Sequence, residues 1–508
     1  KTELYLRAAA WCLRHGRSAL ILAPEIALSS QVASRFSARF GSQVAILHSA
    51  LSAAERAATW RGVAEGRYPI VVGPRSALFA PIPNLGLIVV DEDHDPSYKQ
   101  QEGLRYSARD LAVWRARDAG ITVLLGSATP SLESWQHARS GRYLLLALPT
   151  RAVSSTPPDI RLLDTRRVTL KQGMAPELID AIGQRLAQGQ QALVFLNRRG
   201  YAPVLHCPAC GWVSGCRQCS AYMVLHRGKA GADLRCHHCG ARERVLRACP
   251  DCGNQDLQPM GRGTQRVEEH LAEHFPQARI ARIDADSTRL KGSAERLFAQ
   301  VHAGEVDILV GTQMVAKGHD FRNLGLVGVL NADAMLFSHD FRAPERLFAQ
   351  LMQVAGRAGR HTGGSQVIIQ TGYPEQPVYQ ALVRHDYAGF AAHGLAERES
   401  AGLPPFAHQA LLTAEAGDLA ETLAFLAQAR EQGEAVLPCF SAAATVTLYD
   451  PVPLRVVRVN NVERAQLLVE SASRPALQAF LRGWLARLPE LPGARRVRWQ
   501  LEVDPLEI

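Results

Sequence analysis

Eight of the ten cysteines in this chain are crowded between positions 207 and 252, where they form four Cys-x-x-Cys pairs. The pairs are Cys207/Cys210, Cys216/Cys219, Cys236/Cys239 and Cys249/Cys252. Two cysteines at this spacing can turn both thiolates toward one ion, and two pairs complete a tetrahedral zinc shell with bonds of about 2.3 Å. The pattern therefore predicts two zinc ions. Disulfides suit it less well, because they are typical of small secreted domains rather than of a long chain such as this one.

The order of the pairs also predicts how they combine. The two inner pairs flank a stretch of 16 residues, which is the length of a hairpin, while the two outer pairs lie on either side of it. Nested pairing closes the inner site first without crossing connections. We expect an outer site of Cys207, Cys210, Cys249 and Cys252, and an inner site made by the other four cysteines.

Formal charge gives a first indication of what this cysteine module does. Seven Lys and Arg against three acidic residues give it +4. Eight thiolates and two divalent zincs would add −4. A nearly neutral module favours docking, support or contact with a partner over a purely electrostatic DNA clamp.

The 508 residues around this module are enough for several domains. Apolar runs such as 85–90 and 144–148 are much shorter than the roughly 18 residues that cross a bilayer, so no membrane span is predicted. The formal net charge of +9 favours polyanionic partners.

Short apolar strands alternate with helical patterns, which is typical of α/β folds with parallel sheets. We expect one set of strands at 18–23, 44–48, 70–73, 87–90 and 122–125, and a second at 192–196, 279–283, 307–310, 326–330 and 366–370. The predicted organisation is a first lobe over 1–155, a second over 156–394 with the cysteine module (207–252) inserted, and a small α+β domain over 395–508.

A carboxylate cluster follows one of the expected strands. Strand 87–90 runs into Asp91, Glu92, Asp93 and His94, and the carboxyl ends of parallel strands are where such sheets bind ligands. In a phosphoryl-transfer site, Asp91 would hold Mg²⁺ and Glu92 would polarise the attacking water. Taken alone, the cluster could also be an acidic loop.

Further motifs occur in a consistent order. Lys1 and Thr2 match the end of a Gly-x-x-x-x-Gly-Lys-Thr phosphate loop, whose glycines we then expect upstream in a longer protein. Gly318 ends the stretch 312–318 and is expected near the nucleotide. Gln353, Arg357 and Arg360 lie in a late Gln-Val-Ala-Gly-Arg-Ala-Gly-Arg stretch. We expect both arginines on one helical face, from which they would stabilise charge on the transferred phosphoryl group.

Together these motifs are typical of a two-lobed helicase motor, and the chain resembles the PriA family of bacterial replication-restart helicases along nearly its whole length. The resemblance rests on Asp-Glu-Asp-His-Asp, Ser-Tyr-Lys-Gln-Gln-Glu-Gly, Gly-Ser-Ala-Thr-Pro-Ser, the eight-cysteine insertion and Gln-Val-Ala-Gly-Arg-Ala-Gly-Arg. It implies a superfamily 2 helicase with RecA-like lobes that uses ATP and Mg²⁺ and moves 3′ to 5′ on DNA. It also implies an upstream DNA-binding region. Pro74 departs from the family's usual Thr, which puts a local phosphate or loop contact in doubt.

The resemblance further implies partners and a DNA-coupling loop. Its DNA would be forked, D-loop or single-stranded, and its partners would be primosome proteins and single-stranded-DNA-binding protein. We expect a monomer in the bacterial cytoplasm, associated with the nucleoid. The expected DNA-binding residues are Arg75, Tyr98, Lys99, Arg105 and Tyr106, because aromatic rings can stack on bases while cations contact phosphates. The tyrosines could instead pack beneath the loop.

Two other functions remain open at this point. One is that this chain, which lacks the glycines of the phosphate loop, is a zinc-bearing DNA- or protein-binding platform without ATPase activity, which an ATPase assay would distinguish. The other is a different superfamily 2 DNA translocase, which would lack the cysteine module.

Overall fold

The computed structural model describes most of the chain, in segments interrupted by gaps. These segments are 1–24, 32–49, 51–148, 157–197, 204–228, 231–260, 264–284, 287, 293–316, 321, 323–338, 340–358, 364–437 and 446–508. Two compact units divide the chain: residues 1–199 with 267–394, and residues 200–266 with 395–508. No helix among the described residues is long and apolar enough to cross a membrane.

The first lobe is built on a five-stranded parallel sheet in the order β2-β3-β1-β4-β5. Its strands are β1 (Ser18–Leu22), β2 (Val44–Ile46), β3 (Ile70–Gly73), β4 (Leu85–Asp91) and β5 (Thr122–Gly126). Its helices are α1 (Thr2–Arg14), α3 (Val32–Phe40), α4 (Ala53–Ala64), α5 (Ala108–Asp118) and α6 (Leu132–Arg139), with short 3₁₀ turns η1 (Gly41–Gln43), η2 (Arg75–Phe79) and η3 (Pro96–Tyr98). All five strands expected from the sequence are present.

Alternation along each strand places the helices on both faces of this sheet. In β1, Ala19 and Ile21 pack with residues of α1 and α3. Leu20 and Leu22 pack on the opposite face with α5 and η2. Because both faces are buried, the strands read as continuous apolar runs.

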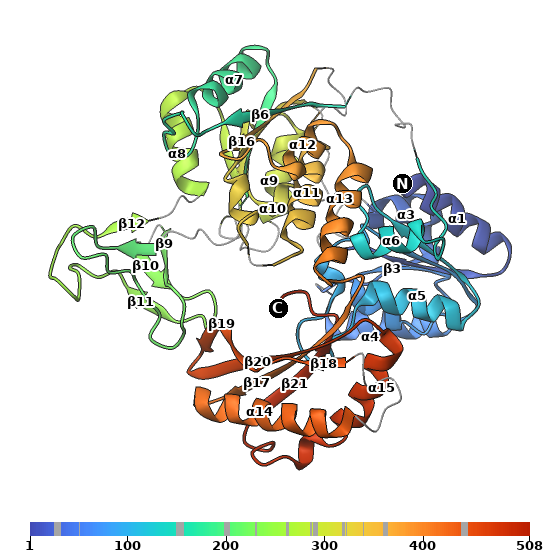
Figure 1. Cartoon of the computed structure of the whole chain (residues 1–508). Coiled ribbons are helices and arrows are strands. Elements are labelled where there is room, and N and C mark those ends of the chain that lie inside the picture. The colour runs from blue at the N-terminus through green and yellow to red at the C-terminus, as the bar shows by residue number, and fades with distance from the viewer. Residues whose placement is uncertain are drawn as a thin grey trace. The chain divides into compact units, whose positions relative to one another are not determined.

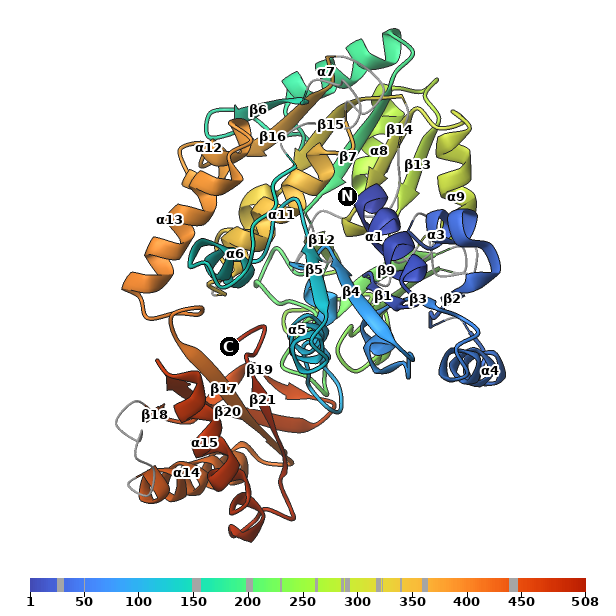
Figure 2. The same ribbon diagram turned by 90° about the vertical axis from the view of Figure 1, so that its right-hand side faces the viewer.

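The second lobe has a six-stranded parallel sheet in the order β13-β14-β7-β15-β16-β6 (Figure 2). The strands are β6 (Asp159–Asp164), β7 (Gln191–Leu196), β13 (Ile280–Ile283), β14 (Ile308–Gly311), β15 (Leu324–Leu330) and β16 (Gln366–Thr371). The helices are α7 (Pro176–Ala187), α8 (Thr264–His274), α9 (Ser293–His302), α10 (Gln313–Ala316), α11 (Ala343–Ala355), α12 (Pro377–Val383) and α13 (Tyr387–Ser400), with the 3₁₀ turn η4 (Ala332–Met335). Helices α7 and α8 pack on one face of this sheet, and helices α9, α11 and α12 pack on the other face.

The other unit contains two antiparallel sheets. In the cysteine module the order is β11-β10-β9-β8-β12, formed by β8 (Val204–His206), β9 (Val224–Gly228), β10 (Gly231–Arg235), β11 (Arg242–Arg244) and β12 (Gln258–Met260). In the C-terminal part the order is β18-β20-β17-β21, with β19 also paired to β20.

Helices α14 (Leu419–Val436) and α15 (Arg474–Leu485) pack on the C-terminal sheet (Figure 1). The strands are β17 (His408–Ala416), β18 (Val446–Leu448), β19 (Val452–Val459), β20 (Val462–Ser471) and β21 (Arg498–Val503), and the 3₁₀ turn η7 (Leu488–Glu490) follows α15. The structure therefore agrees with the mixed α/β architecture expected from the sequence.

Candidate functional site

The carboxyl end of β4 carries the expected acidic cluster. Asp91 ends the strand and is 7% exposed. The hydroxyl of Tyr5, on α1, donates to its Oδ1 at 3.0 Å. Glu92, the next residue, has φ +50°, a left-handed backbone that side-chain-bearing residues rarely adopt and that is enriched at functional sites.

Lys1 lies between these two carboxylates. Its Nζ is 2.6 Å from Oε1 of Glu92 and 3.7 Å from Oδ1 of Asp91. Burial alone would lower the pKa of Lys1, but the charges of Glu92 and Asp91 raise it above its usual value. For Glu92, burial alone would raise the pKa, and the charges of Lys1 and Arg357 bring it below its usual value. The ion pair therefore keeps Glu92 ionised, as an acceptor of protons must be.

His94 joins this cluster to two further residues. Its Nδ1 lies 2.7 Å from Oγ of Ser127, just beyond β5, and its Nε2 lies 3.1 Å from Nε2 of Gln353 on α11. An amide nitrogen can only donate, so this geometry fits the histidine tautomer that carries its proton on Nδ1 and donates it to Ser127. Gln353, expected at the site from the sequence, therefore connects the second lobe to the acidic cluster of the first.

Arg357 is where the expectation from the sequence is wrong in detail. Helix α11 ends at Ala355 and Gly356 caps it, so Arg357 lies in the turn beyond and not on a helical face. The two glycines of the motif are a physical reason, since glycine is a poor helix former and weakens the helix here. Arg357 is nevertheless buried and its charge lowers the pKa of Glu92, which places it at the acidic cluster. Arg360 and Gly318 lie outside the described residues.

Several residues between the lobes were not anticipated. The backbone N–H of Leu132, at the start of α6, donates to Oε1 of Glu345 at 2.9 Å. The ring of Trp135 packs edge-on against Tyr387 with centroids 5.2 Å apart. Each pair is more than 200 residues apart in the chain, so no local pattern could reveal it.

The residues present suit a magnesium nucleotide. Asp91 offers a buried carboxylate at the end of a strand, and Lys1 offers an ammonium beside it. Asp91 and the hydroxyl of Thr2, the first residue of α1, would hold Mg²⁺, while the ammonium of Lys1 would hold phosphate oxygens. The metal would supply charge neutralisation on the phosphate.

Two of the expected DNA contacts are buried. Tyr98 is 3% exposed, and its hydroxyl lies 2.6 Å from the carbonyl of Asp91 and 3.0 Å from that of Leu22. Lys99 is 6% exposed. The alternative interpretation, in which the tyrosine packs beneath the loop, is therefore correct for Tyr98. Its ring supports the loop after β4 and is not placed to stack on bases.

The other three expected DNA-binding residues, Arg75, Arg105 and Tyr106, are only partly buried. Arg75 donates from NH1 to the carbonyl of Ser97 at 2.9 Å. Tyr106 packs edge-on against Phe79 with centroids 5.0 Å apart. Arg75 and Tyr106 line a cavity of about 550 Å³ in the first lobe.

The sequence did not point to the other walls of this cavity. Phe79 is 51% exposed, and Trp60 and Arg56 of α4 also line the cavity. Aromatic rings beside guanidinium groups suit a base and its phosphate. The signal that could have found them is the pairing of aromatic and basic residues at 56–60 and 75–79.

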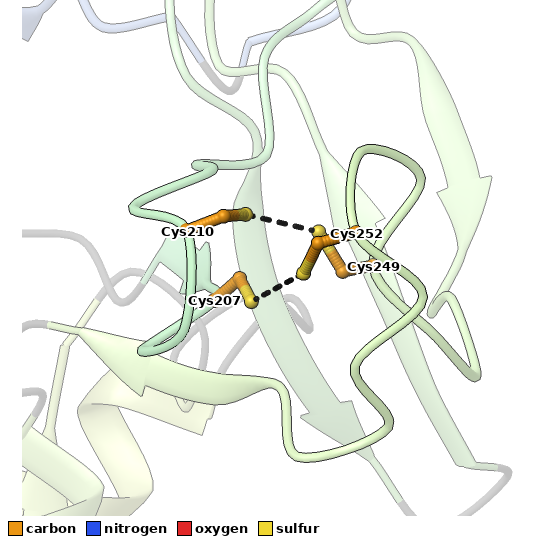
Figure 3. A group of neighbouring side chains, drawn as sticks. All are labelled: Cys207, Cys210, Cys249 and Cys252. Carbon is orange, nitrogen blue, oxygen red and sulfur yellow. Dashed lines mark hydrogen bonds between the residues drawn. The ribbon is translucent and has the colours of Figure 1, made fainter.

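The cysteines form two groups of four with the nested composition predicted above. In the outer group, Cys207 Sγ lies 3.5 Å from Cys252 Sγ, and Cys210 Sγ lies 3.5 Å from Cys249 Sγ (Figure 3). In the inner group, Cys216 Sγ lies 3.7 Å from Cys239 Sγ. A tetrahedral shell with bonds of about 2.3 Å places its sulfurs about 3.8 Å apart, whereas a disulfide needs about 2.05 Å. The arrangement therefore suits two zinc ions.

Four family models match this chain. They are the DEAD/DEAH box helicase (residues 1–138), the helicase conserved C-terminal domain (260–362), the PriA DNA helicase Cys-rich region domain (216–244) and the primosomal protein N C-terminal domain (399–506). The Cys-rich match and the sulfur geometry together support zinc as the ion of the cysteine module.

Curated relatives match along the whole chain. Replication restart protein PriA of Haemophilus influenzae is 42% identical over 100% of this chain and 68% of its own length. That of Bacillus subtilis is 40% identical over 99% of this chain and 62% of its own length. A solved structure of RecG bound to a three-way DNA junction is similar over 75% of this chain and 40% of its own, at 17% identity and with a TM-score of 0.42. The match to the Haemophilus relative along the whole of this chain and the two PriA-specific domains show that this chain belongs to the PriA family of replication restart proteins.

Proposed function

We propose that this chain is the motor of an ATP-dependent DNA helicase that moves 3′ to 5′ and acts at stalled forks and D-loops to restart replication. The observation that carries the proposal is the cluster at the end of β4. There Lys1, Asp91 and Glu92 lie together, and His94 reaches Gln353 of the second lobe. The names of the relatives support the biological role.

The residues have distinct roles in this proposal. Glu92, ionised and close to Lys1, would orient the water that attacks the terminal phosphate and accept its proton. Arg357 would stabilise the negative charge that develops on the phosphoryl group, as arginines do in related motors. Asp91 is fixed by Tyr5, so the metal ligand would stay in place as the lobes move. The cavity lined by Arg75 and Tyr106 would take single-stranded DNA.

An ATPase and unwinding assay on the full-length protein, phosphate loop included, tests the proposal. Glu92→Gln keeps the size of the side chain but removes its basicity, so single-stranded-DNA-stimulated hydrolysis should fall at least a hundredfold, as for other general bases. Glu65→Gln, an exposed glutamate after α4, is the matched control and should keep full activity. Partial duplexes with a 3′ or a 5′ tail should show which tail supports unwinding. Equal hydrolysis by Glu92→Gln and the unaltered protein would overturn the assignment.

The alternative of a zinc-bearing binding platform makes a different forecast. DNA binding would persist, and neither the unaltered protein nor any variant would show DNA-stimulated hydrolysis. Primosome proteins and single-stranded-DNA-binding protein belong to the proposal as partners. A pull-down with each purified protein would test them separately from the motor.

A further inference from the structure

The four Cys-x-x-Cys turns, here called knuckles, are not closed alike. In three of them the glycine four residues after the first cysteine donates its N–H back to the carbonyl of that cysteine: Gly211 to Cys207, Gly240 to Cys236 and Gly253 to Cys249, each at 2.9 Å. All three glycines have positive φ, between 75° and 80°. The tight return of the chain therefore depends on glycine at this position.

The knuckle of Cys216 and Cys219 has Ser220 at the corresponding position. Its N–H donates to the carbonyl of Arg458, 2.8 Å away in the C-terminal part of the same unit. Two more bonds run the other way: Asn461 N–H donates to the carbonyl of Gln218 at 2.8 Å, and Asn460 N–H donates to Sγ of Cys219 at 3.2 Å. A segment more than 200 residues away thus closes this knuckle.

The donating segment is shaped for this contact. Strands β19 and β20 are joined by Asn460 and Asn461, with φ values of 52° and 61°. Positive φ at both central residues is the mark of a tight type I′ hairpin turn, in which asparagine is favoured. Val459, directly before the turn, packs against the apolar cluster of the cysteine module that contains Leu205, Met223 and Leu234.

We propose that the tip of this hairpin, residues 458–461, is a positioning element for the inner zinc site. The Asn460 amide donates to a thiolate of the site, and the hydrogen bonds to Ser220 and Gln218 hold the knuckle in the conformation that presents Cys219. Partners of this kind orient metal ligands and strengthen metal binding. Zinc binding at the inner site should consequently depend on the contact between this hairpin and the knuckle of Cys216 and Cys219.

Zinc release to a chelator tests the link, with the outer site as an internal control. In the full chain loaded with zinc, Val459→Glu places a charge against the apolar cluster and should speed release from the inner site about tenfold, within the usual range for such partners. Release from the outer site should stay unchanged. Val452→Glu puts the same charge on the same strand where the side chain is 48% exposed, and it should behave like the unaltered protein. Unaltered release of both zincs from Val459→Glu would overturn the proposal.

Hydrogen exchange resolved to single residues gives a second test that needs no hairpin variant. With zinc bound, the amides of Ser220 and Asn461 should exchange slowly. Emptying the inner site with Cys236→Ser and Cys239→Ser should make both exchange quickly, while Gly211 and Gly253 of the outer site stay protected. Fast exchange of Ser220 in the unaltered, zinc-loaded protein would show that the hairpin does not hold the knuckle in solution.

Discussion

The amide nitrogen of Gln353, near the end of α11, lies 3.1 Å from Nε2 of His94, which follows the acidic cluster of the first lobe. The other ring nitrogen of His94, Nδ1, lies 2.7 Å from Oγ of Ser127, which is in the turn after β5. The His94 side chain therefore lies beside Glu92, the turn after β5 and a residue of the second lobe. The environment of the His94 ring should therefore change when the two lobes move apart.

Gln353→Leu should uncouple the lobes while leaving nucleotide binding nearly intact, because it removes the donor to His94 and keeps the size of the side chain. We expect DNA-stimulated hydrolysis to fall about tenfold, which corresponds to about 1.4 kcal/mol of transition-state stabilisation. Fluorescent nucleotide titration should give an unchanged Kd. Gln188→Leu, at an exposed position after α7, is the control. Equal losses of nucleotide affinity and turnover would indicate a role for Gln353 in binding instead.

Tyr98→Phe should cost stability and spare DNA binding. The hydroxyl is buried between the carbonyls of Asp91 and Leu22, so removing it leaves an acceptor without its donor, at a cost of about 1 to 3 kcal/mol. Thermal unfolding of the variant should therefore begin earlier, while its affinity for single-stranded DNA should match that of the unaltered protein. A selective loss of DNA affinity would restore the stacking role predicted from the sequence.

Asp307 supplies a pH-dependent contribution to stability. It accepts from Nε of Arg279 at 3.0 Å and from NH2 at 2.7 Å, and these hydrogen bonds lower its pKa although burial opposes them. Because the folded pKa lies below the unfolded value of about 3.9, the stabilisation is present above about pH 4 and is lost as the pH falls through the folded pKa.

Asp307→Asn should therefore lower the free energy of unfolding by about 1 kcal/mol at pH 7, since the pair is bidentate but partly exposed. In urea unfolding, the difference from the unaltered protein should be constant between about pH 8 and 5 and shrink below about pH 4. Asp118→Asn, at an exposed position, should show no such trend. A difference that does not change with pH would indicate that the lost contact is not electrostatic.

The parallel sheets could be predicted from the sequence because their strands are buried on both faces and read as apolar runs, as Ile70–Gly73 does. Strand β6 could not, because Asp159–Asp164 mixes charged and apolar residues at the edge of its sheet and follows two prolines. Composition alone also could not tell that Tyr98 points inward while Tyr106 lines a cavity. The contact of Asn460 with Cys219 depends on two segments 241 residues apart, so only the folded chain reveals it.

The cavity beside η2 yields the last prediction, on DNA affinity. Phe79 is half exposed and packs against Tyr106, so it can present a ring face to a base. Phe79→Ala should weaken binding of single-stranded DNA by about 1 to 3 kcal/mol, the usual contribution of one stacked base, with little loss of DNA-independent hydrolysis. Trp114→Ala is the matched control, because this ring on α5 is 62% exposed and does not line the cavity. Fluorescence anisotropy with a labelled oligonucleotide measures both. If the two variants lost affinity equally, general surface apolarity and not this cavity would account for the binding.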